Sequence, residues 1–449
     1  MTQMKSFPRG GVFPPLTAEL SRREPVTNAA VPPRAVIPMR QHAGEPAECI
    51  VHSGDMVREG MVIGKAFGRH CAHVHASIPG RVVGISQAAD AFGGVCQAVV
   101  IDLEGEFDRS GRCTTVRAWE NLPSFDLLGL VQAAGIVEMG GLREPTHLRL
   151  AVLPGTAARL LVANGVESDP SLSCVSALLR EKPRQIVEGI RIAMKILGPS
   201  AGAVLAVGGA DVRLVPAFER AVDSAGADID IAVVSSRYPQ ADGQLLAAAL
   251  EGRGTGRGST ARRSARQPAL GKDVMLGVAT LLAVYEAVVL DKPLIEGIVT
   301  VGGSPVCRPR NLKARFGTPI AELIDECGRL GEAPGAVVLG GSMTGRAVDW
   351  LQVPFTKGTT GVLVLSQREA RVPPAHACIG CGRCLDACPW GLEPTRLFKL
   401  LEHGRVEEAL SEGLGECTVC GCCAYVCPSR IPLAKGLDRG QRGRPLRGI

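Results

Sequence analysis

The sequence predicts a multidomain α/β protein with an all-β region near its N-terminus and a cysteine-rich domain near its C-terminus. Three observations support this prediction. Short apolar runs alternate with GD and EG turns over residues 36–103, apolar strands alternate with helical stretches from about 126 to 240, and nine of the 16 cysteines lie between Cys378 and Cys427. A chain of 449 residues has room for several domains of ~100–200 residues each.

Composition and charge exclude several classes of protein. The net charge of +6 is too small to indicate a nucleic-acid partner, although it suits acidic or anionic neighbours. The N-terminus has no apolar segment of the signal-peptide type. The longest apolar run, residues 274–290, carries Glu286 and is too short to span a bilayer. We therefore expect an intracellular protein with reduced cysteines that is not itself transmembrane.

The all-β region contains VHSGDMVREG (51–60), which resembles the barrel-sandwich domains that carry biotin or lipoate. Such carriers need a lysine at a hairpin tip, and the equivalent HVHASIPG (73–80) has none, which favours a structural module. His70, His73 and His75 leave two interpretations open, a metal site or a plain strand. Their near alternation, with no distant partner in the sequence, favours the strand.

The middle of the chain has the pattern of an α/β domain. HLRLAVL (147–153) and AGAVLAVG (201–208) are expected as strands, and RQIVEGIRIAMKIL (184–197) as a helix. The Gly/Ser/Arg-rich stretch 252–268 is expected either to be a solvated insertion or to be a docking patch for an acidic partner or anionic lipid head groups. Residues 293–366 return to short strands and turns, which indicates a small α+β module.

The cysteine-rich end contains two copies of the spacing C-x2-C-x2-C-x3-C-P. At this spacing three thiolates bind one iron cube and the fourth binds the cube of the other motif. We therefore predict one [4Fe–4S] cluster bound by Cys378, Cys381, Cys384 and Cys427, and a second bound by Cys417, Cys420, Cys423 and Cys388. Cys422 fits neither repeat. The alternative, a zinc site, needs only two C-x2-C pairs and leaves too many thiolates unused.

The order of these parts resembles the RnfC subunits of Rnf/Rsx electron-transport complexes, on the segments FPRGGVFPP, IPMRQHAGEPAE, VHSGDMVREG, GIVEMGG followed by PTH, YEAVVLDKPLIEGIVTVGG and VPFTKGTTGVLVL ahead of the paired cysteine motifs. The resemblance covers nearly the whole chain. It implies an N-terminal barrel-sandwich hybrid domain (1–115), an α/β core like the complex I flavoprotein (116–290), a β-grasp module of the soluble-ligand-binding type (291–366), a bacterial ferredoxin-like 2[4Fe–4S] domain (367–435) and a basic tail (436–449).

The same resemblance implies a function. It indicates a peripheral subunit on the cytoplasmic face of the inner membrane, where an ion-translocating complex passes electrons between NADH and ferredoxin. The implied partners are the other subunits of that complex, with ferredoxin or another redox protein as a further candidate, and FMN and NADH are candidate ligands. No general acid, base or nucleophile is required, and whether the chain itself oxidises NADH stays open. The alternative is a stand-alone flavin- and NADH-dependent reductase, such as a microcompartment cobalamin reductase, although the N-terminal barrel-sandwich argues against its order of modules.

The chain departs from the family in the flavin loop. Relatives carry GGAGFPTH where this chain has GGLREPTH (140–147), so that Arg143 would add a long side chain to a crevice suited to a planar ring. YPQADGQLL (238–246) has lost a glycine and a glutamate, and Leu276–Gly277 stands where an asparagine is common. The residues implied to bind FMN or NADH are Gly140, Gly141, Thr146, Asn164, Glu167 and Asp169. Two hypotheses follow: the site is degraded and the clusters exchange electrons with another protein, or a rearranged loop still binds FMN and NADH.

Overall fold

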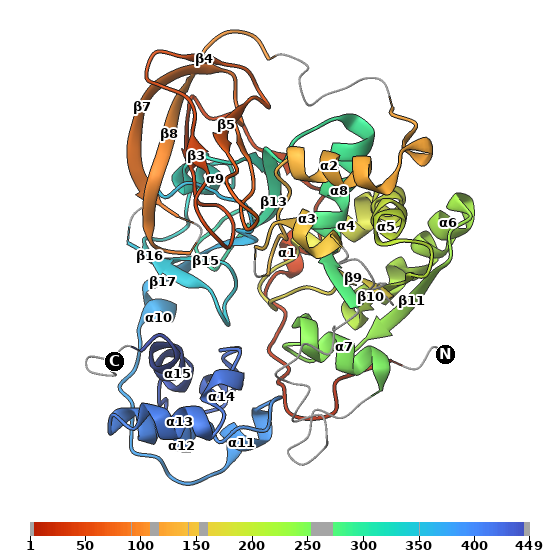
Figure 1. Cartoon of the computed structure of the whole chain (residues 1–449). Helices are drawn as coiled ribbons and strands as arrows, with labels where there is room; N and C mark the ends of the chain where they lie inside the picture. The colour runs from red at the N-terminus through yellow and green to blue at the C-terminus, as the bar shows by residue number, and fades with distance from the viewer. Residues whose placement is uncertain are drawn as a thin grey trace.

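The computed structural model describes residues 4–90, 92–107, 116–141, 143–151, 160–252, 273–349 and 351–443. Figure 1 shows a β-rich lobe at the upper left, an α/β lobe on the right and a helical C-terminal lobe below them. None of the helices in these ranges has the length and apolar character needed to cross a membrane. The Gly/Ser/Arg-rich stretch 252–268 lies almost entirely outside the described residues.

The barrel-sandwich domain consists of two small sheets that face each other. One sheet has the order β2 (Arg34–Pro38), β8 (Val95–Leu103), β7 (Gly80–Ala89), β4 (Met56–Val57), and the other has the order β3 (Glu48–Cys49), β5 (Val62–Lys65), β6 (Val74–His75). Every second residue of β2 points inward, and Ile37, Ile63 and Ile78 are fully buried between the sheets. The expected all-β region is therefore confirmed.

Residues 5–28 pack outside this domain, although the resemblance implied one unit from residue 1 to 115. Residues 5–12, here called the N-terminal arm, run along the α/β core, where Lys5 pairs with Val234 and Val12 with Tyr238. The amide of Gly11 donates to the carbonyl of Ala387 in the C-terminal lobe at 2.9 Å. The chain then forms α1 (Glu19–Arg23) and β1 (Thr27–Asn28), which extends the β-grasp sheet.

The α/β core is built on a four-stranded parallel sheet with helices on both faces (Figure 1). Its strands lie in the order β11 (Ile229–Val234), β10 (Gly202–Gly208), β9 (Leu160–Gly165), β12 (Asp273–Gly277). Its helical elements are η1 (Trp119–Asn121), α2 (Ser124–Ala133), α3 (Thr146–Leu150), α4 (Cys174–Glu181), α5 (Pro183–Leu197), η2 (Gly209–Leu214), α6 (Val215–Ala225), α7 (Gly243–Glu251) and α8 (Val278–Leu290). The predicted strand at 201–208 and helix at 184–197 are confirmed, whereas residues 147–150 belong to α3.

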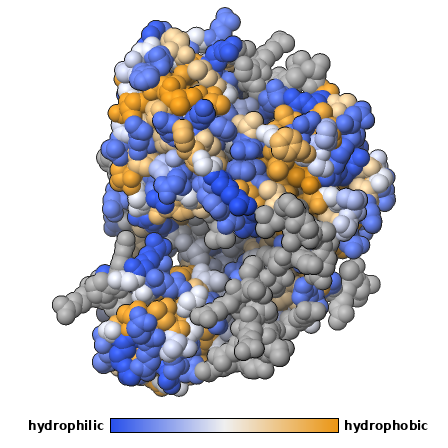
Figure 2. Space-filling model, in the orientation of Figure 1, coloured by the Kyte–Doolittle hydropathy of each residue, from blue (hydrophilic) through white to orange (hydrophobic). Residues whose placement is uncertain are grey.

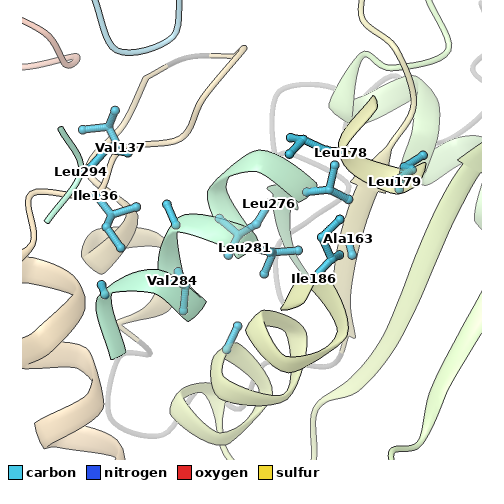
Figure 3. Close-up of a cluster of buried hydrophobic side chains, with 14 of the residues drawn as sticks. Ile136, Val137, Ala163, Leu178, Leu179, Ile186, Leu276, Leu281, Val284 and Leu294 are labelled. Atoms are coloured by element: carbon cyan, nitrogen blue, oxygen red, sulfur yellow. The ribbon is translucent and has the colours of Figure 1, made fainter. Parts of the chain in front are cut away.

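The main apolar core lies between α5, α8 and the sheet. Figure 3 shows Leu281 and Val284 of α8 on the side that faces Ile186 of α5. Helix α5 begins at Pro183, which suits a first helical position because its missing N–H would have no partner there. The two helices approach closely at Gly189, where a Cβ would collide with the carbonyl oxygen of Leu281. Full burial of a leucine such as Leu281 contributes about 1.5–3 kcal/mol.

The β-grasp module is a mixed six-stranded sheet that carries one helix, α9 (Ile320–Asp325). Its strands lie in the order β1, β14 (Arg310–Arg315), β13 (Glu296–Gly302), β17 (Gly361–Ser366), β15 (Pro334–Leu339), β16 (Arg346–Val348). Arg315 pairs with Glu59 of the barrel-sandwich domain at 2.5 Å, and both side chains are buried. This ion pair ties the two domains together.

The C-terminal lobe, here called the cluster domain, follows α10 (Gln367–Ala370). Its helical elements are α11 (Arg383–Ala387), α12 (Pro394–Glu402), α13 (Val406–Ser411), η4 (Leu414–Glu416), α14 (Cys422–Tyr425) and α15 (Leu433–Gln441). Helix α15 extends through residues 436–441 of the expected basic tail. Leu433 and Leu437 lie one turn apart and are buried against α12, and Gly436 lets the helix approach Phe398. Residues 444–449 lie outside the described residues.

Candidate metal centres and adjoining cavity

The four thiols predicted for the first cluster surround one cavity. Cys378, Cys381, Cys384 and Cys427 all line a hollow of about 750 Å³ at the end of the cluster domain. Gly380 and Gly382 have φ values of 67° and 74°, which let the loop turn so that its cysteines face the same space. Cys384 Sγ lies 3.1 Å from the hydroxyl of Thr395. A four-iron cube needs this kind of enclosure, so the residues fit the predicted cluster.

The first group of thiols lies at the surface. Cys378 and Cys381 are exposed, and Ile379 between them is 71% exposed. Basic side chains, Arg396, Lys399 and Arg405 among them, line the same hollow. In Figure 2 the cluster domain is a separate lobe whose visible face mixes apolar and hydrophilic side chains. An electron on this cluster would therefore be within reach of another protein.

The four thiols predicted for the second cluster lie close to one another. The pKa of Cys417 is raised to about 12, mainly by burial and also by the nearby sulfurs of Cys420 and Cys388. The pKa of Cys423 is raised by burial first and then by the sulfurs of Cys417, Cys420 and Cys388, which places the four sulfurs in one group. The amide of Val419 points at Cys417 Sγ from 3.4 Å. Amide donors of this kind set the potential of an iron–sulfur cluster.

Cys422 belongs to neither predicted set of ligands, although its sulfur lies beside the second group of thiols. Its side chain is fully buried and packs with Val12, Tyr238 and Ala387. Its Sγ lies 4.0 Å from the carbonyl oxygen of Tyr238, and its thiol also interacts with the sulfur of Cys420. Among the described residues, no three or more His, Cys, Asp or Glu side chains form a group that could hold a single metal ion.

A larger cavity adjoins the second group of thiols. Its volume is about 1900 Å³, and its walls come from the α/β core, the β-grasp module, the tip of the β7–β8 hairpin and the cluster domain. Thr418, Val419 and Cys420 form part of the wall. The hydroxyl of Tyr238 donates to the carbonyl of Cys420 at 2.7 Å, and Tyr238 also lines the cavity. A molecule bound in this cavity would lie beside the second cluster.

Three of the six residues implied to bind FMN or NADH line this cavity: Gly140, Gly141 and Asn164. The Asn164 amide is fixed in place, because it donates to the carbonyl of Ala241 at 3.0 Å and accepts from the amide of Val166 at 3.1 Å. The cavity is large enough for a flavin nucleotide, and a loop of bare backbone lies at its wall. In size and position it fits FMN.

The other three implied residues support the walls from behind. Thr146 is fully buried at the start of α3. Glu167 accepts from the amides of Val175 and Ser176 at the start of α4, and burial raises the pKa of Glu167 to about 7. Asp169 is buried and holds the turn that follows β15, because it accepts from the amide of Met343 at 2.8 Å. Met343 lines the cavity.

Arg143 does not enter the crevice, contrary to the expectation from sequence. Its backbone has a φ of 55°, which turns the side chain away from the cavity wall. The guanidinium lies 5.1 Å from the centre of the Phe92 ring, and its Nη2 is 3.5 Å from the carbonyl of Gly358. The Arg143 side chain therefore packs against the barrel-sandwich and β-grasp domains.

Several cavity residues carried no signal that we read from the sequence. Arg40, Asp90 and Phe92 bring the barrel-sandwich domain to the cavity, and they lie more than twenty residues before the α/β core in sequence. Asp242 lines the cavity while capping α7, where it accepts from the amide of Gln244 at 3.1 Å. Glu138 lies at the start of the loop that runs from Val137 to Pro145, and for this residue an acidic side chain within an apolar stretch was the available signal.

Three domain families match parts of the chain: the RnfC barrel sandwich hybrid domain over residues 6–106, the Nuo51 FMN-binding domain over 131–286 and the 4Fe-4S dicluster domain over 377–431. A subunit of the proton-translocating ferredoxin:NAD(+) oxidoreductase complex from Clostridium ljungdahlii is 33% identical over 91% of this chain and 87% of its own. The corresponding protein of the sodium-translocating complex from Acetobacterium woodii is 31% identical over 87% and 86%.

A third relative, which belongs to the ion-translocating oxidoreductase complex of Rhodobacter capsulatus, is 34% identical over 90% of this chain and 77% of its own. Among solved structures, an NAD+-reducing [NiFe]-hydrogenase in its H2-reduced state is similar with a TM-score of 0.51 at 19% identity. That similarity covers 74% of this chain and 64% of the hydrogenase chain, and it shows a shared fold.

Proposed function

Because the chain belongs to the RnfC family of ion-translocating oxidoreductase subunits, we propose that it relays electrons through two [4Fe–4S] clusters. The relay connects a soluble donor or acceptor, either NADH or a protein, with the other subunits of such a complex and is coupled there to ion translocation. Ferredoxin or a related redox protein is the proposed partner at the surface. The proposed location is the cytoplasmic face of the cell membrane, with the chain bound peripherally.

One observation carries this proposal: the two predicted clusters differ in what they face. The Cys420 loop forms part of the wall of the large cavity, whereas Cys378 and Cys381 lie at the surface of the molecule. Electrons would thus pass between the cavity and the surface through the second cluster and then the first. Each cluster would supply one-electron redox chemistry, and the protein sets the potentials through burial and hydrogen bonds to sulfur.

The residues of the chain have definite tasks in this relay. Tyr238 holds the Cys420 loop against the cavity through its 2.7 Å hydrogen bond. The amides of Val419 and Leu392 are directed at the sulfurs of Cys417 and Cys388, each at 3.4 Å. These amides would stabilise the extra negative charge that a reduced cluster carries, because N–H donors favour the more anionic state.

The cluster assignment is tested by iron and acid-labile sulfide analysis of anaerobically purified protein. The wild type should contain about eight irons, as two four-iron clusters require. Cys427→Ser should lose or alter one cluster and change its electron paramagnetic resonance signal, while Cys422→Ser, the matched control, should keep both. Wild-type protein without iron and sulfide, or with zinc alone, would refute the relay.

A second measurement distinguishes the two views of the large cavity. The oxidised protein is titrated anaerobically with NADH while the visible absorbance of the clusters is recorded, and the supernatant of the denatured protein is analysed for FMN. Rapid bleaching together with released FMN would show that the loop binds flavin and that NADH feeds the clusters. Bleaching by a reduced ferredoxin but not by NADH would show that the electrons come from a protein.

A further inference from the structure

The carboxylate of Glu138 lies inside the glycine-containing loop that borders the large cavity. The loop leaves the core at Val137 and returns at Pro145, where the two residues form an isolated antiparallel bridge. The amide of Glu138 donates to the carbonyl of Glu144 at 2.8 Å, which closes the loop at its base. A Cβ on Gly141 would lie 3.0 Å from Glu138 Cδ and would collide with Oε2. The carboxylate is therefore packed directly against bare backbone.

The Glu138 carboxylate accepts from backbone amides that could otherwise bind an external anion. The backbone N–H groups of Arg143 and Gly141 donate toward Glu138 and act to lower its pKa. Backbone amides that point into one concavity form an anion site, which phosphate groups of nucleotides commonly occupy. Here the anion belongs to the chain itself.

The surroundings make this internal anion easy to neutralise. Burial is the largest effect on Glu138 and raises its pKa overall, and Glu144 raises it further. Arg149 opposes this rise but is already paired with Glu144 at 2.8 Å, while the guanidinium of Arg143 also attracts the carboxylate. Within the described part of the chain, Oε2 of Glu138 is buried without a hydrogen-bond partner. The start of α8 also contributes a polar group, the Thr280 hydroxyl, but this hydroxyl accepts from the amide of Met139.

We propose that Glu138 is a specificity-determining residue that occupies the anion site of the loop, so that a phosphate-bearing ligand binds there only when the carboxylate is displaced or neutralised. This inference rests on the proposed use of the cavity for a flavin nucleotide. It accounts for both earlier hypotheses in physical terms, because the cavity itself is open while the amides that would hold a phosphate are engaged. It also predicts that anionic ligands bind more tightly as the pH falls.

The test is FMN binding to the cluster-loaded protein, measured by quenching of flavin fluorescence between pH 5.5 and 8.5. Glu138→Ala and Glu138→Gln are compared with wild type and with Asp126→Asn, which removes the same charge from an exposed position of α2. Both Glu138 variants should bind FMN at least tenfold more tightly at pH 8, and the Asp126→Asn variant should match wild type. Riboflavin, which lacks the phosphate, should bind all four proteins about equally.

The pH dependence of FMN binding provides a second readout, which would not change if Glu138 had only a structural role. The ratio of the wild-type dissociation constant to that of Glu138→Gln should fall toward one as the pH is lowered, because both proteins share the titration of the FMN phosphate. Equal or weaker FMN binding by both Glu138 variants, including no binding by any of the proteins, overturns the inference. A gain that is equally large for riboflavin also overturns it. Failure of the relay would instead appear as absent iron, so the two results can be told apart.

Discussion

Replacement of Lys357 with methionine should change the pH dependence of stability. Lys357 is 1% exposed and donates to the carbonyls of Gly135 at 2.8 Å and His73 at 3.1 Å, so it joins the barrel-sandwich domain to the α/β core. Burial lowers the pKa of Lys357 from 10.5 to about 7. In the unfolded chain the amine keeps its ordinary pKa.

The sign follows from proton binding. Between pH 7 and 10.5 the unfolded state binds more protons than the folded state at Lys357, so the free energy of unfolding rises with pH across this window. At ~1.36 kcal/mol per pKa unit the full rise is about 5 kcal/mol, and about 3 kcal/mol of it falls between pH 7 and 9.5. His42 and His75 also have lowered pKa values, of about 4 and about 3, and they titrate below this window.

Urea unfolding of the anaerobic protein, followed by circular dichroism at several pH values, measures this rise. The Lys357→Met variant should lack it, and Lys65→Met, at an exposed position of β5, should show the same rise as wild type. Loss of the two hydrogen bonds should also make the Lys357→Met variant less stable at pH 9.5, by about 1–3 kcal/mol for each carbonyl left unpaired. Parallel stability curves for wild type and Lys357→Met would refute the reasoning.

Two further predictions concern contacts between domains. Gly10→Ala should loosen the cluster domain, because the new Cβ would lie 2.5 Å from the backbone of Cys388. Gly68→Ala is the control, because Gly68 has a similar positive φ but open space around it, so this change should only add backbone strain. Limited proteolysis between residues 366 and 378 should be faster in the Gly10→Ala variant, and equal rates in both variants would contradict the prediction. Arg315→Met should cost about 3–5 kcal/mol, because it leaves the fully buried carboxylate of Glu59 without its arginine partner. Thermal unfolding would measure that loss, and a melting temperature equal to that of wild type would contradict it.

The parts of the fold that repeat a local pattern could be predicted from the sequence. The strand at 201–208 and the helix at 184–197 have clear periods, and the doubled cysteine spacing indicates which thiols should group. The stretch HLRLAVL misled because its apolar residues suit either structure, and residues 146–150 became helical in the tertiary context. The tail beyond residue 436 looked polar, yet Leu437 is buried and Gly440 packs closely against Leu401, so α15 continues to Gln441.

The details of the cavity could not be predicted, for two physical reasons. Its walls combine segments that are distant in sequence, such as Phe92 and Thr418, and no local pattern links them. The direction of Arg143 depends on a backbone conformation with positive φ, which is unusual for a residue with a side chain. The sequence did not show that Arg143 leaves the crevice while Glu138 takes the amides.

The N-terminal arm has a consequence for how the polypeptide is made on the ribosome. Gly10 and Gly11 contact Cys388 and Ala387, which are synthesised roughly 375 residues later. At ~5–20 residues per second the arm waits about 20–75 s for that contact, although its pairing with Val234 can form sooner. The residues that emerge first therefore make a contact that forms among the last, because a nascent chain cannot complete it before Ala387 and Cys388 have left the exit tunnel.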